Sequence, residues 1–331
     1  MPNPYISGTG FYLPPRVVTN DDLSKYMDTT DEWIQERTGI KERRYVEKGV
    51  GPSDLAIPAV EQALEAAGLT VGDIDFIIFA TSTPDFYAPG SGCVLQEKMG
   101  FNEIGALDIR VQCSGFIYGM SIAEQYIKTG TFKNILLIGA EVQSTAMDLT
   151  DTGRDTAVIF GDGAGAVIIS ATEDNRGILS THMHSEGKYA KELWLESPAS
   201  NAGHPRITGE DLEQGKQYLK MNGREVFRHA ITRFPEVINE CLSANNLHTS
   251  DIDLLIPHQA NLRITQMVQK KLGLSNDQVF SNIQKYGNTT AATIPIALAE
   301  VVKEGKISEG DIVVFAAFGS GFTWASAVVR W

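Results

Sequence analysis

Short runs of apolar residues, each long enough for one buried strand, recur along the chain and alternate with longer amphipathic segments. The apolar runs are FIIFA at 76–80, NILLIGA at 134–140, AVII at 166–169, LLIP at 254–257 and DIVVFAAF at 311–318. Between them, apolar positions with helical spacing mark segments that start at Pro58, Ser121 and Ile294. Strands that alternate with helices predict an α/β protein with buried, mostly parallel sheets.

The same pattern occurs twice along the chain. Three pairs of similar segments follow one another in the same order, starting at Leu64 and Leu242, at Ala123 and Ala299, and at Phe160 and Phe318. In the first pair, LEAAGLTVGDIDFII and LSANNLHTSDIDLLI align without a gap and share Asp-Ile-Asp before an apolar run. Convergent βα patterning could produce any one pair, but three ordered pairs predict a duplicated unit. We expect an N-terminal half, 1–175, and a C-terminal half, 176–331, that pack as one body, because no Pro/Gly-rich linker separates them.

Composition narrows the class of protein. A chain of 331 residues with 43% hydrophobic and 8% aromatic residues is typical of a globular protein with a full core. No apolar run approaches the roughly 18 residues of a membrane span, and the first residues, MPNPYISGTGFYLPP, lack the features of a secretory signal. The net charge of −13 argues against nucleic acid or an anionic membrane as the main partner. An acidic protein partner would need a local basic patch on this chain.

The cysteines and histidines give little indication of a disulfide or a metal site. Cys93, Cys113 and Cys241 are odd in number and widely spaced, which fits a reducing cytoplasm better than a disulfide framework or a zinc site. We interpret Cys93 and Cys241 as core residues. His182 and His184 lie on one face of a predicted strand, but no third ligand accompanies them, so no metal is expected.

Cys113 occupies a more distinctive position than the other two cysteines. It stands between ALDIRVQ, which reads as a strand, and a following segment with helical spacing of apolar residues. The thiol is therefore expected at a strand-to-helix turn, where free backbone N–H groups and the helix dipole favour a thiolate and can hold an oxyanion. A small core residue is the alternative.

Two further polar residues lie beside predicted elements of the second half. His258 follows the strand LLIP, so its imidazole is expected at the carboxyl end of that strand, where open α/β sheets bind ligands. Asn288 lies in KYGNTTAA, just before a helix start rich in small residues. The alternatives are a hydrogen-bonded surface histidine and a helix-capping asparagine.

Taken together, Cys113, PHQANLR and YGNTTAA, in this order on a duplicated α/β chain, resemble the thiolase superfamily. More closely, the chain resembles the β-ketoacyl-acyl-carrier-protein synthase III family, from ISGTGFYLPPRVVTN through FGDGAGA to FGSGFTWASAVVRW. The similarity covers essentially the whole chain. It implies a thiolase-like αβαβα fold with two mixed five-stranded sheets, and a homodimer.

The resemblance implies a catalytic triad of Cys113, His258 and Asn288. Cys113 would take the acyl group of an acyl-CoA, and the backbone N–H groups of Cys113 and Ser320 would hold the oxyanion. Many relatives have glycine in place of Ser320. His258 Nε2 and the Asn288 amide would then stabilise the enolate that forms when malonyl-acyl carrier protein loses CO2. Decarboxylation supplies the nucleophile, so we expect no cofactor, and acyl-CoA enters as a substrate.

The resemblance also implies three binding surfaces. Their residues are Trp33, Arg37, Arg154 and Asn261 for CoA, Arg228, Arg263, Lys270 and Lys271 for the acidic carrier protein, and Phe86, Tyr87 and Ala88 for the end of the acyl pocket. The carrier-protein residues would form the local basic patch that this acidic chain needs.

Two departures from the family pattern concern the primer. Enzymes restricted to acetyl primers carry phenylalanine where this chain has Ala88, so we expect a longer primer, unless Phe86 or Tyr87 fills the space. The segment 186–217 is longer and more polar than in the shortest relatives and is expected to shape the pocket entrance.

The expected function is the condensation of an acyl-CoA primer with malonyl-acyl carrier protein, which starts fatty-acid synthesis. The alternative is an acyltransferase or a specialised-metabolite condensing enzyme of the same fold with a different acceptor. A non-catalytic scaffold is a third class, and the presence of Cys113 argues against it.

Overall fold

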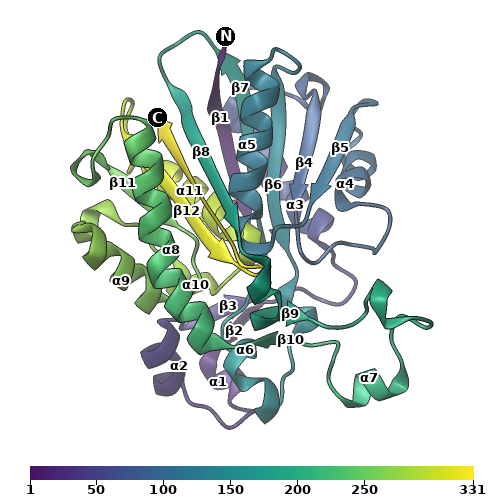
Figure 1. Ribbon diagram of the computed structural model, residues 1–331. Helices are drawn as coiled ribbons and strands as arrows, with labels where there is room; N and C mark the ends of the chain where they lie inside the picture. Colours follow the sequence, from purple (N-terminus) through teal and green to yellow (C-terminus); the bar gives the residue numbers. More distant parts are fainter.

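The computed structural model describes residues 1–331 and stacks two β-sheets between layers of helices (Figure 1). The first sheet has the strand order β1-β7-β6-β4-β5, and the second has the order β11-β12-β13-β8. Helices α5 and α11 lie between the two sheets, α3 and α4 cover the outer face of the first, and α8 and α9 cover the second. This arrangement confirms the layered αβαβα architecture.

The first sheet consists of β1 (Asn3–Tyr12), β4 (Phe76–Ala80), β5 (Gly105–Ile109), β6 (Asn134–Glu141) and β7 (Gly163–Thr172). The second consists of β8 (Gly177–Ser185), β11 (Leu254–Pro257), β12 (Ile312–Gly319) and β13 (Thr323–Arg330). The layer helices are α3 (Pro52–Ala67), α4 (Ser91–Met99), α5 (Gly115–Lys128), α8 (Gly223–Ala244), α9 (Leu262–Leu272) and α11 (Thr293–Lys303).

The shorter elements lie at one end of the layers (Figure 1). They are β2 (Val17–Thr19), α1 (Asn20–Leu23), α2 (Asp31–Thr38), β3 (Glu42–Arg44), α6 (Arg154–Ala157), β9 (Leu193–Leu195), α7 (Gly209–Glu213), β10 (Leu219–Met221) and α10 (Ile283–Tyr286). Helix α7 and its flanking loops, part of the expected insertion 186–217, project away from the layers (Figure 1).

The duplication predicted from the sequence is visible in the hydrogen bonds of two aspartates. Asp75 donates its backbone N–H to the carbonyl of Asn134 and accepts the N–H of Asn134 on its carboxylate, both at 2.9 Å. Asp253 makes the same two bonds with Ile312, at 3.0 and 2.7 Å. In each half, the pair of bonds precedes two parallel strands, β4 with β6 and β11 with β12. The expected boundary between residues 175 and 176 falls in the turn between β7 and β8.

The five apolar runs that predicted strands all form strands, β4, β6, β7, β11 and β12. Three details differ from the expectations. The sheets are mixed rather than mostly parallel, because β7 and β13 run antiparallel to both of their neighbours. The helices expected from Pro58 and Ser121 each begin six residues earlier, at Pro52 and Gly115, and Pro58 lies inside the first of them.

The third difference is the number of strands in the second sheet, which is four rather than five. The place that β5 takes beside β4 is held in the second half by Val279, which forms one parallel bridge with Leu255. The chain leaves the sheet edge there, because Ser281 and Asn282 hydrogen-bond to the side chain of Gln259 and do not extend the ladder.

The largest apolar cluster lies between the two sheets, around α5 and α11, and it fixes both helices in place. The 3₁₀ turns just before these helices, Gln112–Ser114 and Thr290–Ala292, contact each other. The two halves therefore bring the start of one central helix against the start of the other. No helix of the chain combines the length and apolar character needed to cross a membrane.

Candidate active site

Cys113 lies in the 3₁₀ turn between β5 and α5, at the strand-to-helix position that the sequence predicts. The residue before it, Gln112, has a left-handed backbone (φ 43°), a conformation that is uncommon outside glycine and clusters at functional sites. The Cys113 side chain is buried, and the backbone N–H groups of Cys113 and Ser320 are directed at its sulfur. These are the two N–H groups expected to hold an oxyanion.

The loop after β12 approaches the thiol closely because of a glycine. A Cβ placed on Gly319 would lie 2.6 Å from Cys113 Cβ and 2.8 Å from its Sγ, so no other residue fits without a shift. The next residue, Ser320, donates its hydroxyl to the carbonyl of Leu193. The hydroxyl of Ser320 thus has a partner of its own and leaves the backbone N–H of Ser320 available.

His258 follows β11, as predicted, and is buried among apolar walls. Burial lowers its pKa to about 3, so the imidazole is neutral in the physiological range. Nδ1 lies 2.6 Å from Oγ1 of Thr293, and that hydroxyl also donates to the carbonyl of Thr290 at 3.0 Å. A hydroxyl has one proton, so in this arrangement it accepts the Nδ1 proton, and Nε2 carries a lone pair. Nε2 has no hydrogen-bond partner within the chain.

Asn288 does not cap a helix, because the N-cap residues of the following turn and of α11 are Thr289 and Ala292; its side chain instead holds the turn and keeps its amide free. Its Oδ1 accepts the N–H of Thr290 at 2.8 Å, which holds the turn before α11. Its backbone pairs with Ile159 and Gly161, which fixes the loop against the neighbouring segment. The side-chain NH2 group makes no hydrogen bond within the chain and can donate to a bound molecule.

Cys113, His258 and Asn288 line a single, mainly apolar cavity of about 120 Å³. Its other walls come from α8 and from the loops after β11 and β12. The structure therefore brings together the three residues that the resemblance links. A thiol, a neutral imidazole and an amide donor in one mainly apolar cavity can support attack on a thioester and stabilise an enolate.

The cavity opens in two directions. On one side, through Phe227 and Asn261, it meets a surface pocket of about 420 Å³ that Trp33 and Arg37 line. On the other side, past Cys113 and Phe160, it meets a cavity of about 620 Å³. Cys113 lies between the two.

The expected CoA residues cluster at the surface pocket. The guanidinium carbons of Arg37 and Arg154 lie 4.3 and 4.7 Å from the centre of the Trp33 ring, so an adenine would compete with them for the indole. Asn261 caps α9 through the N–H of Arg263 and donates to the carbonyl of Arg37, both at 2.9 Å. Asn261 nevertheless lines both the cavity beside Cys113 and the surface pocket, so it lies along the channel that the two form.

The expected carrier-protein residues lie on α8 and α9, and all four are exposed. Arg263, Lys270 and Lys271 are free of ion pairs, although Lys271 donates to the carbonyl of Ile231 at 2.7 Å. Arg228 differs, because Glu225 binds its guanidinium at 2.6 Å and offsets its charge.

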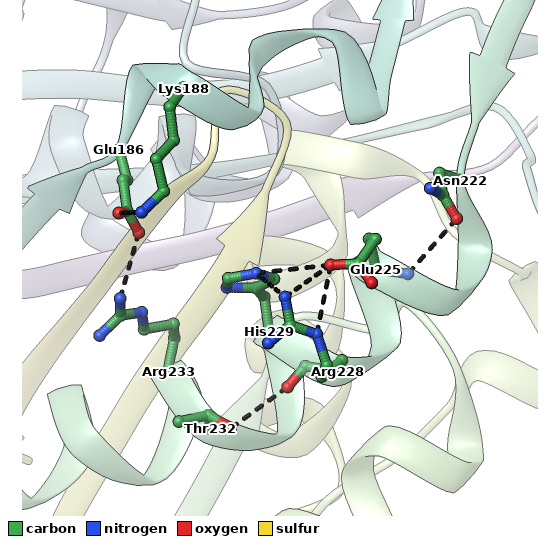
Figure 2. Close-up of polar contacts among 8 residues, drawn as sticks. All are labelled: Glu186, Lys188, Asn222, Glu225, Arg228, His229, Thr232 and Arg233. Carbon is green, nitrogen blue, oxygen red and sulfur yellow. Dashed lines mark hydrogen bonds and ion pairs between the residues drawn. The ribbon is translucent and has the colours of Figure 1, made fainter.

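Figure 2 shows the polar contacts of α8 around Arg228. His229 lies beside both Glu225 and Arg228, and Arg233 reaches Glu186, which also binds Lys188. These contacts tie α8 to the segment after β8.

Of the three residues expected at the end of the acyl pocket, only one lines the cavity beside Cys113. Tyr87 lines the 620 Å³ cavity, whereas Phe86 and Ala88 are exposed and do not line it. The segment 186–217 contributes a wall of this cavity, from Leu193 to Asn201, rather than the mouth on the CoA side.

Glu141, at the end of β6, is a buried carboxyl beside the site that the sequence reasoning missed. It accepts hydrogen bonds from Ser82, Thr83, Gln143 and the backbone of Ala291. Burial raises its pKa to about 7, against the effect of these bonds. Burial, and secondarily Glu141, raise the pKa of Cys113 to about 12. The only feature of the sequence that could have pointed to Glu141 is its place as an acidic residue directly after an apolar run that predicts a strand.

The structure also locates the two cysteines that were interpreted as core residues and the two histidines for which no metal was expected. Cys93 is exposed on α4 and is not a core residue, since it lies on the helix face that turns away from the sheet; Cys241 is buried as expected. His182 and His184 do lie on one strand face, but both contact the carboxylate of Glu240 on α8, at 3.4 and 2.6 Å, which places them in a polar contact between β8 and α8.

Comparison with known proteins finds relatives along the whole chain. The family model described as 3-oxoacyl-[acyl-carrier-protein (ACP)] synthase III matches residues 107–187, and the model of its C-terminal part matches residues 242–331. A β-ketoacyl-[acyl-carrier-protein] synthase III of Xanthomonas campestris pv. campestris is 45% identical over 326 residues, 98% of each chain. One from Caldanaerobacter subterraneus subsp. tengcongensis is 46% identical and covers 98% of this chain and 97% of its own.

The solved structures agree with the sequence relatives. The 3-oxoacyl-[acyl-carrier-protein] synthase III from Aquifex aeolicus VF5 superposes with a TM-score of 0.90 at 44% identity. The superposition covers 99% of this chain and 100% of the other.

Proposed function

The chain belongs to the β-ketoacyl-[acyl-carrier-protein] synthase III family, whose condensation forms a 3-oxoacyl-acyl carrier protein in fatty-acid synthesis, and we propose that it performs this reaction through an acyl-enzyme on Cys113. The protein is thus an acyltransferase of the condensing type. The observation that carries the proposed mechanism is the single cavity that Cys113, His258 and Asn288 line, between a surface pocket of about 420 Å³ and a second cavity of about 620 Å³. Relatives this similar do not favour the alternative of a different acceptor.

In the first half-reaction, Cys113 attacks the carbonyl carbon of the acyl-CoA thioester. Its raised pKa keeps the proton on sulfur at neutral pH, so the proton must leave as the new S–C bond forms. The lone pair on His258 Nε2 accepts it, and the N–H groups of Cys113 and Ser320 hold the oxyanion. The CoA thiolate then leaves and takes the proton from Nε2, which returns the imidazole to its neutral form.

In the second half-reaction, the malonyl thioester of the carrier protein enters along the same channel. Its terminal C–C bond breaks, CO2 leaves, and the electron pair forms an enolate whose oxygen faces Asn288 and His258. Here Nε2 must donate, so the imidazole first changes tautomer: Nδ1 releases its proton to water and Nε2 takes one up from water. The hydroxyl of Thr293 can then turn and donate to the lone pair on Nδ1. The enolate carbon attacks the acyl-Cys113 carbonyl, the bond from that carbon to sulfur breaks, and the 3-oxoacyl product leaves. The Cys113 thiolate then takes a proton from solvent and becomes a thiol again.

Both substrates carry negative charge, and the chain has a separate basic surface that can bind each of them. For CoA we propose Trp33 and Arg37, with Arg154 beside them and Asn261 along the pantetheine arm. For the acidic carrier protein we propose the exposed cations of α9. They are Arg263, Lys270 and Lys271, with Arg228 as a weaker contributor because Glu225 pairs with it.

We propose a homodimer formed at the outer edge of β5. That strand is the last of the first sheet, and a second copy can pair with its free edge and extend the sheet. Helix α4 packs beside β5 and carries the exposed Cys93. The loop that leads into α4 exposes Phe86, Tyr87 and Ala88. Pairing there would bring a partner's residues to the end of the acyl cavity. Light scattering tests this: twice the chain mass supports it and a monomer contradicts it.

We place the enzyme in the cytoplasm, because a thiol nucleophile must stay reduced and the three cysteines are free. The test of the proposed function is reconstitution with a panel of acyl-CoAs and malonyl-acyl carrier protein, read by mass spectrometry of the carrier protein. A 3-oxoacyl product with loss of CO2 supports the condensation. An acyl group transferred without decarboxylation would contradict it and point to the acyltransferase alternative.

A further inference from the structure

Asn282 joins the segment that precedes Asn288 to two other parts of the active site. Its backbone N–H donates to the side-chain oxygen of Gln259 at 3.3 Å, and its side-chain NH2 group donates to the carboxylate of Glu300 at 2.8 Å. Gln259 directly follows His258 in the chain, and Glu300 lies on α11. Gln259, Asn282 and Glu300 are all buried, so their hydrogen bonds form an internal network.

Glu300 is the centre of the contacts that hold α10. Besides Asn282, which directly precedes α10, it binds the last two residues of that helix. The hydroxyl of Tyr286 donates to the carboxylate at 2.8 Å, and Nζ of Lys285 lies 3.3 Å from a carboxylate oxygen. Asn288 follows two residues after Tyr286, so the carboxylate fixes the helix that leads directly to the Asn288 amide.

The same network reaches the imidazole of His258 from two directions. Gln259 holds the loop that carries His258, since its NH2 group donates to the carbonyl of Pro257 at 2.6 Å. On the other side, α11 holds the ring through Thr293, whose hydroxyl lies 2.6 Å from Nδ1. His258 and Asn288, the two proposed donors to the enolate oxygen, are thus tied to each other through one set of buried hydrogen bonds.

A buried carboxylate is a costly way to join two helices. Lys285 is the one cation that pairs with Glu300, and apolar residues of similar volume hold helices together at least as well as a buried ion pair. A fully bonded polar network adds direction, because it fixes one arrangement of its members. Two donors that converge on a single oxygen atom need such a fixed arrangement, since a shift of about 1 Å can lower a rate about 100-fold.

We propose that Glu300 is a positioning residue for the condensation step, which holds the amide of Asn288, through α10, where it meets the enolate oxygen. This assignment rests on the proposed function, since it presupposes an enolate that Asn288 stabilises. Glu300 does not line the active-site cavity or either pocket beside it, so it acts through Asn288 and not on the substrate. The backbone bonds of Asn288 to Ile159 and Gly161 do not involve Glu300, so the loop keeps its place without the carboxylate.

The test measures the two half-reactions separately in Glu300→Ala. Acylation of Cys113 by acyl-CoA, read by intact mass, does not use Asn288 and should remain unchanged. Release of labelled CO2 from malonyl-acyl carrier protein should fall roughly 10- to 100-fold. Glu300→Gln should recover most of this rate, because its amide can accept from Asn282 and donate to the hydroxyl of Tyr286.

A double-variant cycle shows whether Glu300 acts through Asn288. Glu300→Ala combined with Asn288→Ala should slow CO2 release no more than Asn288→Ala does alone. Tyr286→Phe removes one bond to the carboxylate and should lower CO2 release roughly two- to tenfold without affecting acylation, so it decides the question if Glu300→Ala does not fold. Glu304→Ala, which removes an exposed carboxylate one turn further along α11, is the matched control and should change neither half-reaction.

The outcomes separate this inference from the proposed function. Unchanged CO2 release in Glu300→Ala, or additive losses in the double variant, overturn the inference alone. Equal losses of acylation and CO2 release, together with a lower melting temperature, also overturn it, because Glu300 would then be merely structural. Absence of both acylation and CO2 release in the wild type overturns the inference and the proposed function together.

Discussion

Nδ1 of His258 lies 2.6 Å from the hydroxyl oxygen of Thr293, the first residue of α11. The contact joins the loop after β11 to the helix that follows Asn288. It is the one hydrogen bond that the His258 imidazole makes within the chain, because Nε2 has no partner. Because the hydroxyl can either accept from Nδ1 or donate to it, Thr293 can pair with both tautomers of the imidazole, the one in which Nε2 accepts and the one in which Nε2 donates. The proposed mechanism needs both states.

Thr293→Val removes this hydroxyl and keeps the shape of the side chain. We expect turnover to fall roughly tenfold, the cost of one buried hydrogen bond to the imidazole. Thr293→Ser should restore most of the rate, because serine retains the hydroxyl. A merely structural role would show as equal loss of stability in both variants, so melting curves accompany the kinetics. Full activity in Thr293→Val would contradict the assignment.

Asn288→Ala should separate the two half-reactions. The amide donor acts on the enolate and not on the acyl transfer, so Cys113 should still accept an acyl group from acyl-CoA. Decarboxylation of malonyl-acyl carrier protein should fall about 10²- to 10³-fold, as for loss of one oxyanion donor. Release of labelled CO2 measures this step. Equal loss of both steps would show that the substitution disturbs the loop instead, since Oδ1 holds the N–H of Thr290.

Glu141→Gln should change the pH dependence of stability. Burial raises the pKa of Glu141 from 4.5 to about 7, so between these values the folded chain holds a proton that the unfolded chain lacks. This contribution is complete below pH 4.5 and is lost as the pH rises through about 7, with a slope of about 1.4 kcal/mol per pH unit. Urea titrations from pH 5 to 8 should show the free energy of unfolding falling more steeply in the wild type than in Glu141→Gln. Parallel curves would exclude a raised pKa.

The proposed contact of the basic side chains of α9 with the carrier protein can be tested by reversing their charge. Lys270→Glu combined with Lys271→Glu should raise the KM for malonyl-acyl carrier protein roughly tenfold at low salt and leave acyl-CoA labelling of Cys113 unchanged. The difference should shrink as salt screens the charges. Lys303→Glu, an exposed lysine at the end of α11, is the control. An unchanged KM would remove α9 from the proposed docking surface.

Much of the fold could be predicted from the sequence because apolar runs and a duplicated pattern are local signals. The repeated Asp-Ile-Asp marks the same pair of hydrogen bonds in both halves. The fifth strand of the second sheet was wrongly expected, because its loss depends on where Ser281 and Asn282 find hydrogen-bond partners, which is a tertiary matter.

Of the site, the sequence pointed to Cys113, His258 and Asn288, which stand in recognisable motifs. It missed Glu141 and the contact of Thr293, since neither lies in a motif and each acts through residues distant along the chain. The position of Cys93 was misjudged because apolar neighbours do not tell which way a short helix is rotated.

The central claim is that acyl groups pass through Cys113, and an intact-mass chase tests it most directly. The protein is incubated with acyl-CoA, its mass is recorded, and malonyl-acyl carrier protein is then added. The account predicts an acyl adduct at Cys113 that disappears as 3-oxoacyl-carrier protein forms, with no adduct in Cys113→Ala and an unchanged one in Cys241→Ala. Turnover by Cys113→Ala, or an adduct that persists after the chase, would contradict it.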